Sequence, residues 1–139
     1  MEFKETCEVT FNNNSATQCG AAIYSSDNSH VTFMGNSNVK FTSNFVFNNP
    51  RRINLLYGGI IYSMQYGTIL FDDNSTVVFS DNHGGTGGAM HSSYYGHIFF
   101  TGNSIILFSN NSASVGGAIH SNDYCKNYII YRKFCCKIW

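Results

Sequence analysis

The sequence predicts an all-β fold: a right-handed parallel β-helix (a solenoid) with about 29 residues and three short strands per coil. The first observation behind this prediction is a repeat. The six residues Gly87-Gly88-Ala89-Met90-His91-Ser92 return 29 residues later as Gly116-Gly117-Ala118-Ile119-His120-Ser121. A fixed period of about 20 to 50 residues is typical of a solenoid.

A Phe-x-x-Asn motif that occurs twice per period is the second observation. The two copies start eight residues apart, and the first starts 13 residues after a Gly. First copies begin at Phe33, Phe71 and Phe100, and second copies at Phe11, Phe41, Phe79 and Phe108. Phe3 occupies a first position, with Thr6 in the place of the Asn. The chain therefore begins in mid-repeat, and we expect the repeats to extend over residues 1–121.

Composition is the third observation. Strand-forming Phe, Tyr, Val, Ile and Thr are abundant, whereas good helix formers are few. Charged residues make up 12% of the chain and the formal net charge is zero, which argues against a nucleic-acid-binding protein. No apolar run of about 18 residues predicts a transmembrane segment. The first residues show no signal sequence.

Short strands are predicted before each Asn of the motif. Apolar and polar residues alternate in Val9-Thr10-Phe11 and in Val39-Lys40-Phe41, which is the pattern of a strand with one buried face. Three such strands per period cannot bury a core alone, so the coils must stack with equivalent strands paired in parallel, about 4.8 Å apart. Crossovers between parallel strands are right-handed as a rule.

Stacking predicts a role for each repeated residue. The Phe residues of each copy form ladders that fill the interior, and the Asn residues lie at turns, where Asn tolerates a left-handed backbone and its amide bonds along the axis. The Gly-Gly pairs allow tight corners. Two places depart from the period: a loop insertion at about 45–57, and one extra residue near Cys19. Residues 122–139 read as a non-repeat tail or a cap.

The paired motifs resemble the repeats of the chlamydial polymorphic outer membrane proteins, and similar repeats occur in surface proteins of some animals. The resemblance covers residues 3–121. It implies a secreted or surface-displayed right-handed β-helix that acts as an adhesin, associated with the outer membrane if the source is bacterial. In that family the two motifs are implicated in adhesion, which points to Phe100, Asn103, Phe108, Asn111, Gly116, Gly117, Ala118 and Ile119. The residues themselves favour a core and corner role for these positions.

A second candidate site is a binding strip. Tyr24, Tyr62, His91 and His120 occupy equivalent places and should stack into an exposed ladder that could contact a protein or a glycan on a host or neighbouring cell. His91 and His120 could share a metal with His97 and Asp123, but metal sites need more ligands than this pattern offers. We therefore expect no metal and no cofactor.

Two other functions remain open. A solenoid is a stiff rod, so the chain could be a structural spacer. Some β-helices are polysaccharide lyases or hydrolases, which need paired carboxylates at a set separation. Asp72, Asp73 and Asp81 are the candidates for such a pair or for a Ca²⁺ site, but acidic residues are too few for a convincing cluster, and we expect no enzyme. The five Cys residues do not show a zinc pattern, and their pairing cannot be deduced.

The stacked architecture predicts that this chain self-associates. Terminal coils expose strand edges, and open edges template pairing with another copy. Light scattering at increasing protein concentration should show a rising average mass. A concentration-independent monomer would contradict the prediction.

Overall fold

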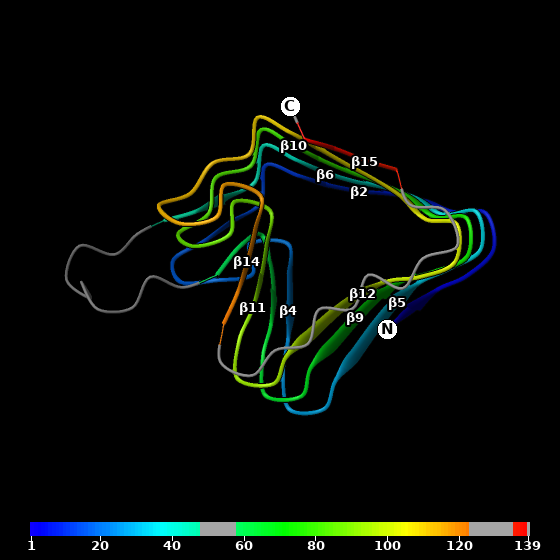
Figure 1. The fold of residues 1–139 in the computed structure, drawn as a ribbon, viewed down its shortest axis with the longest axis horizontal. Helices are drawn as coiled ribbons and strands as arrows, with labels where there is room; N and C mark the ends of the chain where they lie inside the picture. Colours follow the sequence, from blue (N-terminus) through cyan, green and yellow to red (C-terminus); the bar gives the residue numbers. More distant parts are fainter. Residues whose placement is uncertain (48–57, 123–134, 139) are drawn as a thin grey trace.

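The computed structural model describes residues 1–47 and 58–122 in full and, of the remainder, the backbone of residues 135–138. The described residues form strands and turns. Figure 1 looks down the stack of coils, so that equivalent strands from successive coils lie side by side. The chain winds counterclockwise in Figure 1 from the fainter N-terminal coil to the brighter later coils, which is the right-handed sense. The structure is therefore a parallel β-helix, as the sequence predicts.

Sheet 1 forms one wall and contains four parallel strands in the order β1-β5-β9-β12. Their bounds are Glu2–Phe3, His30–Phe33, Thr68–Phe71 and His97–Phe100. In β9 the burial alternates, because Ile69 and Phe71 face the core while Thr68 and Leu70 face outward. The register pairs the first Phe of every coil with the first Phe of the next.

Sheet 2 forms the second wall, with five parallel strands in the order β2-β6-β10-β13-β15. Their bounds are Glu8–Asn12, Asn38–Thr42, Thr76–Ser80, Ile105–Ser109 and Cys135–Ile138. Strand β15 lies in the segment that the sequence analysis describes as a tail or cap, and it extends sheet 2 by pairing with β13.

Sheet 3 forms the third wall, with four parallel strands in the order β4-β8-β11-β14. Their bounds are Ile23–Ser25, Ile61–Ser63, Met90–Ser92 and Ile119–Ser121. All three residues of β8 and of β11 are buried, on the outward as well as the inward side. No helix in the described part of the chain is long and apolar enough to span a membrane.

A fourth pairing position lies between sheets 2 and 3, so the prediction of three strands per coil was incomplete. Strand β3 (Ser15–Ala16) pairs with β7 (Phe45–Val46), and isolated bridges continue the ladder through His83 to Ser112. Backbone hydrogen bonds from Phe45 to Asn14 and from Val46 to His83 hold β7 in the coil. The insertion predicted at about 45–57 therefore begins after Val46, and residues 48–57 lie outside the described residues.

Both departures from the 29-residue period, the insertion and the extra residue near Cys19, lie at this corner between sheets 2 and 3. The paired Asn residues of successive coils are separated by 30, 38 and 29 residues along the chain. The step of 38 contains the insertion between β7 and β8, and the step of 30 contains the extra residue between β3 and β4. The three walls keep their register because the surplus residues are confined to one corner.

Two stacks of Phe rings fill the interior, as predicted. Phe3, Phe33, Phe71 and Phe100 are stacked with centroids 4.7, 5.0 and 5.2 Å apart. Phe11, Phe41, Phe79 and Phe108 are stacked with centroids 4.8, 4.7 and 5.2 Å apart. The interplanar angles are 14° or less, which is the geometry of parallel, offset aromatic rings.

The Asn residues of the second motif form an interior hydrogen-bonded ladder, which we call the Asn ladder: Asn14, Asn44, Asn82 and Asn111. The Nδ2 of Asn44 donates to Oδ1 of Asn82 at 3.0 Å and to the carbonyl oxygen of Phe11 at 3.0 Å. The backbone N–H of Asn44 donates to the same Oδ1 at 3.1 Å. Asn44 and Asn82 are only 1% exposed, so each carboxamide is buried and bonded on both its nitrogen and its oxygen.

The Asn residues of the first motif behave differently. Asn36, Asn74 and Asn103 lie on the surface, where their side chains form longer bonds of 3.4 and 3.2 Å. The prediction that the motif Asn residues adopt the left-handed backbone was wrong for both copies. The preceding residue adopts it instead, with φ of 57° at Asp73 and 57° at Asp81. The motif Asn of the second copy is thereby free to point into the interior.

The Gly-Gly pairs have two distinct roles. The first Gly is left-handed, with φ of 71° at Gly87 and 62° at Gly116. The second Gly lies against the next coil, since a Cβ on Gly59 would stand 2.5 Å from the carbonyl oxygen of Gly87. The predicted tight corner is therefore confirmed, and the second Gly also allows a close approach between coils.

We expect Asn82→Ala to lower the free energy of unfolding by roughly 3–5 kcal/mol. The substitution removes the acceptor of the buried Asn44 carboxamide and backbone N–H, and the donor to the Phe41 carbonyl oxygen. The matched control is Asn74→Ala in the same coil, at an exposed site, for which we expect a change of about 0.5 kcal/mol or less. Urea unfolding followed by circular dichroism measures both. Equal losses at the two positions would show that the Asn ladder has no special role.

Candidate functional site

The predicted binding strip lies on the outward side of sheet 3. The register pairs Tyr24 with Tyr62, Tyr62 with His91, and His91 with His120. Neighbouring ring centroids lie 5.7, 5.0 and 4.9 Å apart. The interplanar angles are 33°, 70° and 77°, so the last two contacts are edge-to-face. The four residues form a ladder, but not one with a flat surface.

The centre of this ladder is buried, which corrects the expectation of an exposed strip. Tyr62 is 2% exposed and His91 is 4% exposed, whereas Tyr24 at one end is 51% exposed. Residues before β8 and β11 cover the two central side chains: the amide of Gly58 and the hydroxyl of Thr86 both reach the His91 ring. A ligand approaching the flank meets Tyr24 and part of His120, and not the whole ladder.

Hydrogen bonds define the state of His91. The Gly58 N–H, which can only donate, lies 3.1 Å from Nδ1, so Nδ1 is an acceptor and Nε2 carries the proton of the neutral ring. Nε2 then donates to Oδ1 of Asn122 at 3.0 Å. The Tyr62 hydroxyl lies 2.6 Å from Oγ of Ser93. Both central side chains of the ladder therefore have structural partners, and the binding role of the four residues stays a prediction.

The proposed metal ligands do not converge in the part of the chain that the structure describes. Both ring nitrogens of His91 are engaged by protein groups. His97 lies on β12 in sheet 1, a different wall from His91 and His120. Within residues 1–47 and 58–122 no three His, Cys, Asp or Glu side chains form a cluster that could hold a metal ion. Asp123 lies outside the described residues.

The residues of the repeat motif divide into buried and surface groups. Phe100 and Phe108 are buried in the Phe stacks, so neither lies on the outer surface of the coil. Asn103 is exposed and Asn111 ends the described Asn ladder. The four residues Gly116, Gly117, Ala118 and Ile119 lie at the surface of the last described coil. A direct adhesive contact is thus open only to Asn103 and to the Gly-Gly-Ala-Ile corner.

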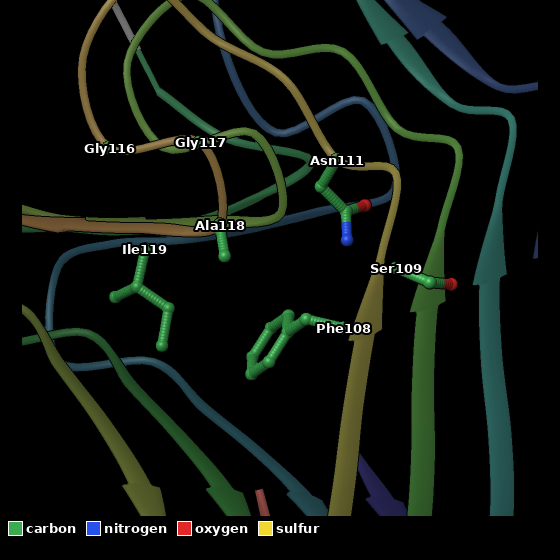
Figure 2. A pocket seen from close by; sticks show the side chains of 7 residues that line it. All are labelled: Phe108, Ser109, Asn111, Gly116, Gly117, Ala118 and Ile119. Carbon is green, nitrogen blue, oxygen red and sulfur yellow. The ribbon is translucent and has the colours of Figure 1, made fainter. Parts of the chain in front are cut away.

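A hollow of about 400 Å³ lies at this end of the coil stack. Figure 2 shows Phe108, Asn111, Ala118 and Ile119 around it, with Gly116 and Gly117 on the loop beside them. In the preceding coil the equivalent Phe79, Asn82 and Gly88 are covered, because the next coil packs on them. Because β15 already pairs with β13 at this end, the hollow is the part of the end surface, around the Gly-Gly-Ala-Ile corner, that a further coil would cover. The self-association through the coil ends stays a prediction.

The candidate carboxylates diverge. Asp72 accepts a hydrogen bond from Thr101 in the next coil, whereas Asp73 accepts one from the N–H of Gly35 in the preceding coil. Asp81 follows β10 at a different turn, where it accepts from Asn110. Each carboxylate caps a turn and links neighbouring coils.

The structure describes the side chains of Cys7 and Cys19, and both are free thiols. Cys7 takes the place of the buried Ser37, Ser75 and Ser104, and its Sγ lies 3.2 Å from Oγ of Ser37. Cys19 is half-buried, and this burial raises the pKa of its thiol to about 11. Neither environment is that of an activated nucleophile.

A third corner, between sheets 3 and 1, carries exposed tyrosines that were not predicted as a site from the sequence. Tyr66, Tyr94 and Tyr95 lie in the turns that follow β8 and β11, and each is exposed. The signal was present in the 29-residue period, since Met64-Gln65-Tyr66-Gly67 and Ser93-Tyr94-Tyr95-Gly96 both end on a Gly before a strand. It was weak because Asp27-Asn28 occupies the same place in the first coil.

Comparison with known proteins identifies the repeat. The family model of the Chlamydia polymorphic membrane protein repeat matches residues 8–26 and residues 105–122. The two matches begin at β2 and at β13, equivalent strands of sheet 2, and both end after the following strand of sheet 3. The chain therefore carries this repeat in its first and its last described coil. No curated protein and no solved structure gave a significant match.

We expect His91→Ala to lower the free energy of unfolding by about 2–4 kcal/mol, because it creates a cavity and removes the ring nitrogen that accepts from the buried Gly58 amide. Tyr24→Ala, at the exposed end of the same ladder, should cost less than about 1 kcal/mol. Chemical unfolding of both variants tests the assignment. A loss at Tyr24 as large as that at His91 would contradict it.

Proposed function

We propose that this chain is a secreted or surface-displayed β-helix module that binds a protein or a glycan on another cell surface, as an adhesin does. The observation that carries the proposal is the match of two coils to the repeat of a bacterial membrane-protein family. That family name supports a location at the cell surface, associated with the outer membrane. The chain offers several coils of one repeat, which suits a partner with an extended surface.

The geometry supports binding by the outer surface and not by the core. Both Phe stacks and the Asn ladder face inward, where they hold the coils together. The side chains that vary from coil to coil lie on the outward sides of the strands and at the corners. We place the binding function on these outward positions, which can change without loss of the stack.

A spacer function is the second candidate. Every wall is hydrogen-bonded from coil to coil, which makes a stiff rod irrespective of any ligand. An enzymatic function has less support, because Asp72, Asp73 and Asp81 do not converge. Glycoside hydrolysis requires two carboxyl groups that face each other across the scissile bond.

Binding to intact cells tests the proposal. We expect fluorescently labelled protein to bind saturably to cultured animal cells, as measured by flow cytometry, and unlabelled protein to compete with it. The absence of saturable binding to every cell type tried would favour the spacer.

A variant with three substitutions separates binding through the exposed Asn residues of the motif from binding through the other outward-facing side chains. The combined substitutions Asn36→Ala, Asn74→Ala and Asn103→Ala remove the exposed motif Asn side chains and leave the buried Asn ladder intact. We expect cell binding to change by less than about twofold, because we place the binding on the outward-facing side chains that vary from coil to coil. A loss of tenfold or more, in a variant with an unchanged circular dichroism spectrum, would assign the contact to the motif itself.

A further inference from the structure

The corner between sheets 3 and 1 contains three stacked two-residue turns within the described residues. They join β4 to β5, β8 to β9 and β11 to β12, and Figure 1 shows them side by side at the bottom of the view. In each turn a backbone N–H donates to the carbonyl oxygen three residues earlier: Ser29 to Ser26 at 2.9 Å, Gly67 to Met64 at 2.8 Å and Gly96 to Ser93 at 2.8 Å. The turns follow one another up the stack in strict register.

Both central residues of every turn are left-handed. The φ values are 53° and 62° at Asp27 and Asn28, 48° and 65° at Gln65 and Tyr66, and 46° and 64° at Tyr94 and Tyr95. This is the geometry of a type I′ turn, for which Asn-Gly and Asp-Gly are the favoured pairs. Asp27-Asn28 suits it. A left-handed backbone is unfavourable for a bulky residue such as Tyr, so the other two pairs are unexpected.

The tyrosine side chains are not buried in the core, so core packing does not compensate for their unfavourable backbone. Tyr66, Tyr94 and Tyr95 are 56%, 51% and 43% exposed. Tyr66 and Tyr95 stack on each other, with centroids 5.2 Å apart and planes 10° apart, and both side chains keep much of their surface exposed. Folding alone therefore does not account for aromatic residues at this corner. Residues that break a local rule are concentrated at functional sites.

The chemistry of the corner restricts the ligand. Asp27 is the only charged residue among the central residues of the three turns, and the others offer phenol hydroxyls and the amides of Asn28 and Gln65. Aromatic faces bind apolar C–H surfaces, and hydroxyl and amide groups bind polar edges. A pyranose ring combines such an apolar face with a rim of hydroxyl groups. A polyanion would instead need Lys or Arg, which these turns lack.

A peptide strand fits less well. Backbone N–H groups of the turns are already used between coils, since Asn28 donates to Gln65 at 3.2 Å and Gln65 to Tyr94 at 2.9 Å. These N–H groups are therefore not available for β-strand addition. Proline-rich peptides dock in aromatic-lined grooves, whereas this surface is a projecting corner.

We propose that Tyr66, Tyr94 and Tyr95 form a binding surface for an uncharged saccharide chain, whose pyranose rings pack on the exposed parts of the tyrosine side chains. The inference rests on the proposed function, because it names the site and the ligand class through which the module would hold a cell surface. Gln65 and Asn28 lie beside the rings and supply hydrogen bonds to sugar hydroxyls. Since the turns stack in register, the site repeats along the solenoid axis.

The test replaces the tyrosine turns by the pair that the turn geometry prefers. The variant carries Gln65→Asn, Tyr66→Gly, Tyr94→Asn and Tyr95→Gly. We expect its melting temperature to equal or exceed that of the native chain, because Asn-Gly relieves the left-handed backbone. Phe47→Ser, an exposed aromatic residue outside these turns with 52% of its surface in solvent, is the matched control.

Binding is measured on a printed array that carries neutral oligosaccharides, sulfated and sialylated glycans, and proline-rich peptides. We expect the native chain and Phe47→Ser to bind neutral oligosaccharides, and the Asn-Gly variant to lose at least tenfold in apparent affinity. Binding only to acidic glycans or to peptides, equal binding by the folded Asn-Gly variant, or no neutral oligosaccharide bound by the native chain would overturn the inference.

Cell binding by the same proteins separates the two proposals. If the native chain and the Asn-Gly variant bind cells equally, the tyrosine site is wrong and the adhesive function stands. If neutral oligosaccharides are bound through the tyrosines but cells are not bound, the saccharide site stands and the adhesive function fails.

Discussion

The hydrogen bond that passes from one Asn carboxamide to the next is the interaction on which the rest of this structure depends. Asn44 bonds to Asn14 on one side and to Asn82 on the other, and it is almost fully buried. A buried carboxamide without partners is strongly unfavourable, so every coil must place an Asn at the same height and in the same orientation. The Asn ladder therefore specifies register, whereas the Phe stacks and the Val and Ile residues beside them supply the apolar burial.

The register of the paired strands explains where the chain tolerates extra residues. The steps of 30, 38 and 29 residues between successive Asn residues differ by up to nine residues, yet the three walls pair without a break. All of the surplus lies between the β3–β7 ladder and sheet 3, where the described residues form the Gly-Gly corner and cover Tyr62 and His91. The Asn ladder and the Phe stacks leave no such room, because a single extra residue there would turn every inward side chain outward.

The periodic part of the fold could be predicted from the sequence, and the non-periodic part could not. Spacing alone assigned one Phe stack: Phe3, Phe33, Phe71 and Phe100. Residues at the same point of successive repeats occupy equivalent positions in successive coils, so they lie one above another. The burial of His91 could not be foreseen. It depends on Gly58 and Thr86, which reach the ring from segments whose lengths vary between coils. The left-handed residue was misplaced by one position, since Asp81 and Asn82 are both good turn residues and only their hydrogen bonds tell them apart.

The stack also explains how tyrosines can occupy turns that they do not favour. A left-handed backbone is unfavourable by about 1–2 kcal/mol for each residue with a Cβ, and an isolated hairpin with Tyr-Tyr at its tip would be a poor one. In this solenoid the turn conformation is imposed from both sides, because the strands before and after each turn are bound in their sheets and Gln65 is bonded to Tyr94 in the next coil. The stacked Tyr66 and Tyr95 rings offset part of the strain. Once the core specifies the path of the backbone, the identity of the corner residues no longer determines the fold, and those positions can change for recognition while the coil around them stays the same.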